Sequence, residues 1–276
     1  MKSLATLSLS LLILAAARPC VAITNGTVDE HNLFPEVGAF LLIHPPSDQP
    51  DLTVPRIFGS GTLIDSRLIL TAGHVTEAIE FNVAMGRLEP DDFRISFGAN
   101  AFDPATWKEI DTVITHPEFA FEEPDWHDVG VAILKEPVLD VQPATLAPAG
   151  FLKELSAAGA LNSSRPTFTV VGYGDTLLFP PPRPVQRDGL RRFGTQVFLS
   201  LQGPLPWLLL YQNPATGDGG IGAGDSGGPV YWIGDDGTRI LVALNSRGAA
   251  PGPALAYRLD IPQALDFLDF VRFVVD

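Results

Sequence analysis

Eight short runs rich in β-branched and aromatic residues constrain the fold of this chain more than any other feature. Most are bounded by Gly, Pro, Asp or Asn, which is typical of strands joined by turns. A helical repeat of apolar residues starts only at Pro262. About a dozen strands followed by one C-terminal helix predict an all-β fold, built as barrels or as a sandwich. The runs are VGAFLLI (37–43), SGTLIDSRLILTA (60–72), FRISFG (93–98), DTVITH (111–116), VGVAILK (129–135), TFTVVGYG (167–174), TQVFLSL (195–201) and ILVALNS (240–246).

The size and charge of the chain narrow its possible functions. It has 276 residues, of which 46% are hydrophobic, and this is enough to bury one large core or two small ones. The strand pattern fades over residues 143–166, which predicts a boundary between two β-rich halves. The net charge of −14 argues against nucleic acid as a partner, because a polyanion would be repelled.

The first 22 residues have the pattern of a secretory signal peptide. The basic start Met1-Lys2 precedes an apolar run over 4–17. Small residues at Cys20-Val21-Ala22 then provide a site for signal peptidase. The apolar run is too short to span a bilayer comfortably. We therefore expect residues 1–22 to be removed and the protein to be secreted into the extracellular space. An uncleaved membrane anchor is the alternative.

The cysteine content sets a further limit. Cys20 is the only cysteine, so a chain cleaved after Ala22 has no disulfide bond in spite of its secretion. Its stability then has to come from the burial of its core.

The segment GAGDSGGPV (222–230) is the strongest candidate for a reactive site. Glycines permit positive φ and close approach of the backbone. Consecutive N–H groups in such a turn can converge on an anion, so Ser226 would lie beside a preformed oxyanion site. Because a serine hydroxyl is a weak nucleophile by itself, the segment predicts a histidine base elsewhere, held by a buried carboxylate.

One of the five histidines fits the role of base. His74 follows an apolar strand at a strand-to-turn junction, where a rigid scaffold can orient it. Asp128 directly precedes the apolar run VGVAIL, and a carboxylate at the edge of a buried strand needs a hydrogen-bond partner such as His74 Nδ1. We expect no metal at His116 or His127, because neither has a second ligand at tight spacing. The remaining histidines lie in polar or loop segments, at His31 and His44.

The segments LTAGH, HDVGVAIL and GDSGGP resemble, in this order, the three active-site motifs of the trypsin/chymotrypsin-like serine proteases. Further similarity in GSGTLIDSRLILTAGH, ITHPEF and VVGYG extends the resemblance over residues 23–276. It implies two perpendicular six-stranded antiparallel β-barrels and a C-terminal helix. The two barrel halves would cover residues 23–150 and 151–276, with the catalytic cleft between them.

The resemblance implies a role for each matching residue. Ser226 would attack the scissile carbonyl, His74 would take its proton and pass it to the leaving amine, and Asp128 would orient the imidazole and stabilise its cation. The backbone N–H groups of Gly224 and Ser226 would form the oxyanion hole. The expected function is that of a serine endopeptidase, a hydrolase that works through an acyl-enzyme intermediate and needs no cofactor or metal.

Asp225, next to the nucleophile, is expected to be buried and to need a cationic partner. In the family that partner is a newly exposed N-terminal ammonium, and Ile23-Thr24-Asn25-Gly26 resembles the start of a mature enzyme. Cleavage after Ala22 would create this terminus, so signal removal alone would give the active N-terminus. The alternative is cleavage after Ala17, which would leave a short propeptide.

The chain departs from the family's usual pattern in two ways. The cysteines that usually flank the histidine and the serine loop are absent, so this loop has to be held by packing, hydrogen bonds and the Ile23–Asp225 pair. The resemblance implies that the base of the primary specificity pocket lies at Gly220, beside Ile221, where there is no acid. We therefore expect cleavage after apolar or small residues rather than after Arg or Lys.

By the resemblance, the edge strand of the pocket corresponds to residues 244–248, with Ser246-Arg247-Gly248 where family members often have Ser-Trp-Gly. Arg247 either binds an acidic side chain of the substrate or points to solvent, which is the usual place of an arginine. Asp218 lies close to Gly220 in sequence, but it would need a shift of one or two residues to reach the pocket base.

A catalytically inactive secreted binding module on the same scaffold is the alternative function. It predicts a missing triad residue or a blocked oxyanion loop, and the sequence retains all of these residues. The expected partners are protein or peptide substrates, with no nucleic acid and no membrane after signal removal. We expect a monomer.

Overall fold

The computed structural model describes residues 23–121, 126–162, 165–177, 185–248 and 250–275. The predicted signal peptide over 1–22, which contains Cys20, lies outside the described residues. In the part of the chain that is described, no helix is both long and apolar enough to cross a membrane.

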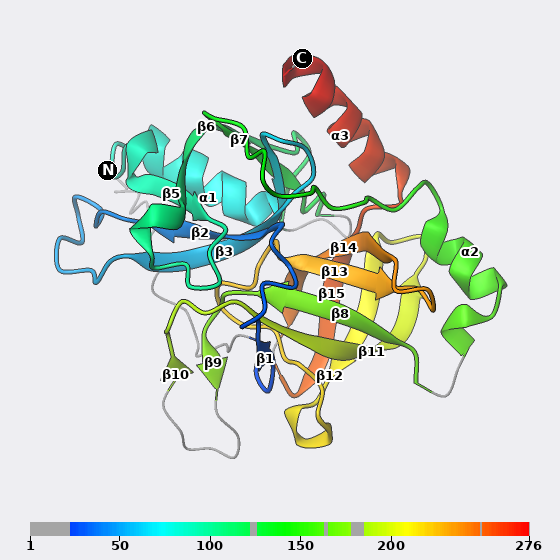
Figure 1. Cartoon of the computed structure of the whole chain (residues 1–276). Helices are drawn as coiled ribbons and strands as arrows, with labels where there is room; N and C mark the ends of the chain where they lie inside the picture. Colours follow the sequence, from blue (N-terminus) through cyan, green and yellow to red (C-terminus); the bar gives the residue numbers. More distant parts are fainter. Residues whose placement is uncertain (1–22, 122–125, 163–164, 178–184, 249, 276) are drawn as a thin grey trace, which may run out of the picture.

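Six antiparallel strands close into a first barrel, in the order β2-β3-β4-β7-β6-β5 (Figure 1). Every residue of β2 and of β7 is buried, as expected for the uninterrupted apolar runs VGAFLL and GVAIL. The strands are β2 (Val37–Leu42), β3 (Arg56–Leu63), β4 (Leu68–Thr71), β5 (Phe93–Ser96), β6 (Trp107–Thr115) and β7 (Gly130–Leu134).

A second antiparallel barrel follows in the order β8-β11-β12-β15-β14-β13, and it closes where β13 pairs back with β8. The expectation of two six-stranded antiparallel barrels and a C-terminal helix is therefore confirmed. The short strands β9 (Thr176–Leu177) and β10 (Val185–Gln186) pair with each other outside this barrel. The barrel strands are β8 (Thr167–Gly172), β11 (Arg192–Gln202), β12 (Trp207–Gln212), β13 (Pro229–Ile233), β14 (Arg239–Gly248) and β15 (Gly252–Arg258).

In the described part of the chain, three α-helices accompany the barrels: α1 (Gly73–Ala84), α2 (Phe151–Ala157) and α3 (Pro262–Val275). The apolar period predicts α3, but α1 differs from the expected strand-to-turn junction and places His74 in the first turn of a helix. The sequence of α1, GHVTEAIEFNVA, mixes β-branched and aromatic residues, which favour strands, with Ala and Glu, which favour helices. Packing against β6 and β7 therefore decides its conformation.

The segment between the two barrels contains α2, which begins at the predicted boundary between residues 150 and 151. The N-terminal segment crosses this division, because β1 (Thr27–Val28) pairs with β11 of the second barrel. Thr24 also forms a bridge with Gly220, next to the serine loop. The start of the described chain is thus positioned by the second barrel.

A buried arginine joins the two barrels. Arg191 Nε donates to Asp29 at 2.8 Å, and both side chains are fully buried. Arg191 Nη1 also donates to the carbonyl oxygens of Val37 and Phe97 in the first barrel and to the hydroxyl of Tyr173 in the second. The described residues contain no cysteine, so no disulfide bond joins the barrels there. This hydrogen-bonded network is a specific connection between them.

Candidate active site

The histidine and the aspartate that were expected to form a proton-transfer pair lie in contact. His74 Nδ1 is 3.0 Å from each carboxylate oxygen of Asp128, and the backbone N–H of His74 donates to Asp128 Oδ1 at 2.9 Å. The Asp128 side chain is fully buried, whereas that of His74 is 21% exposed. The imidazole can therefore meet a substrate while its carboxylate stays shielded from water.

Each partner shifts the pKa of the other. Burial lowers the pKa of His74, but the charge and hydrogen bond of Asp128 outweigh it, and the pKa is raised above its usual value. Burial raises the pKa of Asp128, but the charge of His74 and hydrogen bonds from His74 and Ser246 outweigh it, and the pKa is lowered. The pair thus consists of a stable carboxylate and an imidazole with increased proton affinity, as a general base requires.

Ser246, which the resemblance assigned to the substrate pocket, also contacts the buried acid. Its Oγ donates to Asp128 Oδ2 at 2.5 Å, across 118 positions of sequence. The sequence carries no local signal for this contact, because the second barrel brings Ser246 to an acid that belongs to the first.

Ser226 lies on the loop between β12 and β13, and this loop packs against the segment that leads to His74. Gly227 has φ of +77°, and a Cβ there would lie 2.6 Å from Ala72 N, so only glycine permits this approach. The backbone N–H of Ser60 donates to Ser226 O at 2.7 Å. Within the described residues, no hydrogen bond joins Ser226 Oγ to His74. Such bonds are often long in free enzymes and shorten when substrate binds.

Two backbone donors of the serine loop have no acceptor. The N–H groups of Gly224 and Ser226 make no hydrogen bond within the described part of the chain, whereas those of Asp225 and Gly227 do. Gly224 has φ of +98°, and its carbonyl accepts a hydrogen bond of 2.7 Å from Ser60 Oγ. The fixed turn therefore offers two N–H groups to an oxyanion.

Asp225 and Ile23, the expected activation pair, lie together and are both fully buried. Asp225 accepts hydrogen bonds of 2.9 Å from the N–H groups of Gly174 and Gly222, and the backbone of Ile23 lies close enough to lower its pKa. Burial raises the pKa of Asp225 to about 7, and these hydrogen bonds lower it only in part. When residues precede Ile23, its nitrogen is a peptide N–H, which carries no charge to balance the carboxylate.

Comparison with known proteins decides the family. A family model described as trypsin matches residues 49–268. The chain belongs to the trypsin family. Among solved structures, this trypsin-family chain is similar to the secreted serine protease VesC from Vibrio cholerae, with 17% identity and a TM-score of 0.60. The match covers 88% of this chain and 47% of VesC, so the chain spans about half the length of that protein. A search of curated proteins found no match.

The position expected at the base of the primary pocket is closely packed in this trypsin-family chain. A Cβ at Gly220 would lie 2.4 Å from Ala250 Cβ, so the two residues are in direct contact. Ile221 is 4% exposed and belongs to the core of the second barrel. The carboxylate of Asp218 forms an ion pair with Arg165, so it does not supply an acid for the pocket.

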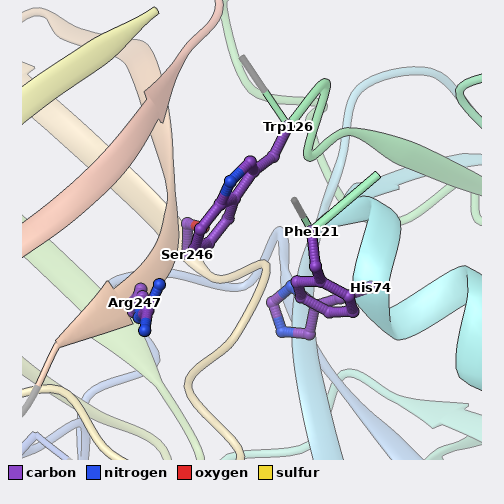
Figure 2. Close-up of a pocket in the computed structure, with 5 residues that line it drawn as sticks. All are labelled: His74, Phe121, Trp126, Ser246 and Arg247. Carbon is purple, nitrogen blue, oxygen red and sulfur yellow. The ribbon is translucent and has the colours of Figure 1, made fainter. Parts of the chain in front are cut away.

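A cavity of about 370 Å³ opens beside His74 (Figure 2). The sequence did not point to the two aromatic side chains in its lining, Phe121 and Trp126, although Trp126 lies only two residues before Asp128. The Phe121 ring centroid lies 6.2 Å from that of His74, and the Arg247 guanidinium carbon lies 4.9 Å from the Trp126 ring centroid. Gly248, the last residue of β14, follows Arg247, and a Cβ there would lie 3.0 Å from Ala254. The cavity is lined by His74, Phe121, Trp126, Ser246 and Arg247.

His116, Glu118 and His127 also gather, although their spacing predicts no metal site. Their possible ligand atoms lie within 4.8 Å of one another. The two imidazoles stack with centroids 4.6 Å apart and 22° between the ring planes, so their in-plane lone pairs run side by side. Tetrahedral zinc needs ligand atoms about 3.4 Å apart whose lone pairs converge on one point. The stacked rings do not meet this requirement.

Proposed function

We propose that the protein is a secreted serine endopeptidase that hydrolyses protein or peptide substrates through an acyl-enzyme intermediate. One observation carries the proposal: a partly exposed His74 contacts the fully buried Asp128, beside a serine loop in which two N–H groups find no acceptor among the described residues. Membership of the trypsin family supports the same reaction. The protein's own secretion rests on the pattern of residues 1–22.

The residues divide the chemistry among them. Ser226 Oγ attacks the scissile carbonyl carbon while His74 takes the hydroxyl proton. The charge that develops on the carbonyl oxygen is stabilised by the N–H groups of Gly224 and Ser226. His74 then gives the proton to the leaving amine, the C–N bond breaks, and an ester to Ser226 remains. Water attacks this ester by the same proton route and releases the acid.

Activity requires a new N-terminus at Ile23 in this proposal. Its ammonium would replace the peptide N–H that now contacts Asp225, and it would supply the charge that the buried carboxylate lacks. This ion pair would hold the oxyanion loop in its open form. Cleavage after Ala22 by signal peptidase is the simplest route to that terminus.

Cleavage after small or apolar residues is the specificity that the primary pocket favours. Contact between Gly220 and Ala250 limits the space at the expected pocket base, and no described acid is available there for Arg or Lys. A short side chain would meet backbone and a methyl group, while a long cation would lack an ionic partner.

Labelling with a serine-reactive phosphonate, followed by mass spectrometry, tests the proposal. We expect one label on Ser226 in protein that starts at Ile23, and we expect the label to be lost in His74→Ala. His44→Ala is the matched control, because His44 contacts Asp92 at 2.8 Å in an exposed pair outside the cleft. This variant should label like the wild type.

The same experiment separates the alternative function. A folded protein with Ile23 at its terminus that neither labels nor cleaves peptides would favour the inactive binding module. N-terminal sequencing of secreted active protein tests the activation step independently, and a start at another residue would contradict it.

A further inference from the structure

We propose that Arg247 recognises an acidic side chain of the substrate, so that this protease prefers Asp or Glu close to the scissile bond on its acyl side. This inference rests on the proposed function and names its substrate class. The sequence alone leaves Arg247 open between substrate and solvent, and four features of the structure favour the substrate.

The first feature is the position of Arg247 in the cleft. It lines the same cavity as His74 (Figure 2). Its neighbour Ser246 donates to Asp128. A substrate whose carbonyl reaches Ser226 and His74 therefore passes the guanidinium within a residue or two of the scissile bond.

The second feature is a bulge in β14. Asn245 pairs with Ala256 and Arg247 with Leu255, so Ser246 is an extra residue in the strand. In a regular strand, neighbouring side chains point to opposite faces. The bulge breaks this alternation, and both Ser246 and Arg247 line the cavity.

The third feature is the orientation of the guanidinium. Its carbon lies 4.9 Å from the centroid of the Trp126 ring. Contact with a ring face limits the rotation of the arginine side chain and leaves N–H groups at the edge of the planar group to bind a carboxylate through two hydrogen bonds. Part of the entropy cost of binding is therefore already met in the free enzyme.

The fourth feature is the lack of an internal partner. Nine of the twelve described arginines contact a carboxylate of this chain. Arg247 is exposed and contacts no carboxylate within the described residues, even though the whole chain carries a net charge of −14. It is a cation held in the cleft with its hydrogen-bonding edge open.

Peptide cleavage tests the inference. Matched peptides keep a small residue directly before a fixed cleavage site, and they carry Glu or Gln in turn at the second and third positions before it. At one of these positions we expect kcat/KM to be ten- to a hundredfold higher with Glu, the size of a hydrogen-bonded charge pair. Arg247→Gln should reduce the ratio to about one, and Arg247→Glu should make Lys preferred over Glu.

Controls separate a local contact from overall charge and from misfolding. Arg272→Gln removes one positive charge from the surface of α3, far along the chain from the cleft residues, and should keep the Glu preference. Phosphonate labelling of Ser226 at the wild-type rate would show that Arg247→Gln retains its active site.

The outcomes distinguish this inference from the function on which it rests. Cleavage without a Glu preference, or a preference that survives in Arg247→Gln, would overturn the acidic specificity and leave the protease proposal intact. Absence of both labelling and cleavage would remove the protease proposal and this inference together.

Discussion

Two buried aspartates of the candidate site, Asp128 and Asp225, have pKa values shifted in opposite directions. Asp128 and Asp225 are both fully buried, and burial raises the pKa of each. The charge and hydrogen bonds of His74 reverse this effect at Asp128, whose pKa is lowered. Asp225 has backbone hydrogen bonds but forms no ion pair within the described residues, and its pKa rises to about 7. Hydrogen bonds alone therefore do not compensate for the burial of a carboxylate here, whereas a nearby imidazolium does.

The two aspartates therefore mark two kinds of region. Folding alone forms the hydrogen-bonded pair at Asp128, whereas the region of Asp225 needs proteolytic processing in our proposal. The His74–Asp128 contact forms within the described chain as it stands. At Asp225 the fold supplies the burial and the position of Ile23, and in our proposal cleavage supplies the charge. The predictions below disturb one region at a time.

The largest effect is expected for Asp128→Asn. Activity should fall roughly 10⁴-fold, because an amide no longer holds the imidazole in the tautomer that accepts the serine proton. The pKa of His74 should also fall, since the carboxylate that raises it is gone. The pH–rate profile would then extend to lower pH, although at a much lower rate. Asp92→Asn, in the exposed pair with His44, is the control and should leave both quantities unchanged.

A smaller loss is expected when the ion pair between Asp225 and the Ile23 ammonium cannot form. A chain that keeps one extra residue before Ile23, or that carries Asp225→Asn, should lose roughly 10²- to 10³-fold in kcat, the range for a damaged oxyanion hole. Pre-steady-state labelling by the phosphonate would slow in parallel. Equal activity of the extended and the processed chain would contradict the proposed activation step.

Ser246→Ala should have an effect of about tenfold on kcat/KM. A hydrogen bond to a charged group contributes about 1.5–3 kcal/mol, and part of this is recovered by the contacts that remain at Asp128. Because the Ser246 bond lowers the pKa of Asp128, its loss should raise that pKa. Kinetics across pH measure both quantities. The half-buried Ser66, whose Oγ donates to Asp65 away from the site, supplies the control Ser66→Ala. A loss as large as that of Asp128→Asn would contradict a supporting role for Ser246.

The smallest effect concerns stability against pH. In the chain that retains residues before Ile23, the folded pKa of Asp225 is about 7, above the ordinary 3.8 of the unfolded chain. The folded state then binds the extra proton, so this stabilising contribution is full below about pH 4 and is lost as pH rises through 7. In the chain that starts at Ile23 the ammonium should reduce this loss. Tm measured from pH 4 to 8 should separate the two forms by several degrees at neutral pH.

A control identifies the source of that pH effect. Asp225→Asn in the unprocessed chain removes the titrating group, so its Tm should change less with pH than that of its parent. Parallel Tm curves for all three proteins would show that Asp225 does not titrate in this range.

The sequence by itself determined the parts of this protein that depend on local pattern. Short β-type runs between turn residues predicted an all-β fold, as barrels or as a sandwich, because alternating and apolar strand patterns are local features of the sequence. The resemblance of three motifs to the serine proteases then implied the two barrels. The glycines around Ser226 predicted a turn that permits positive φ and close packing, and Gly224 and Gly227 adopt it. Asp128 was found because a charged residue at the edge of a buried strand has few acceptable partners.

Only the tertiary structure decided the features that depend on residues far apart in the chain. Packing on β6 and β7 makes α1 a helix, although its sequence has mixed propensity. Closure of the second barrel brings Ser246 to Asp128, and the bulge of β14 brings Arg247 over Trp126. The physical reason is the same in each case. Side-chain direction, pairing and burial are set by neighbours from other elements, so a local pattern predicts that a charged or hydroxyl group exists, and the fold selects its partner.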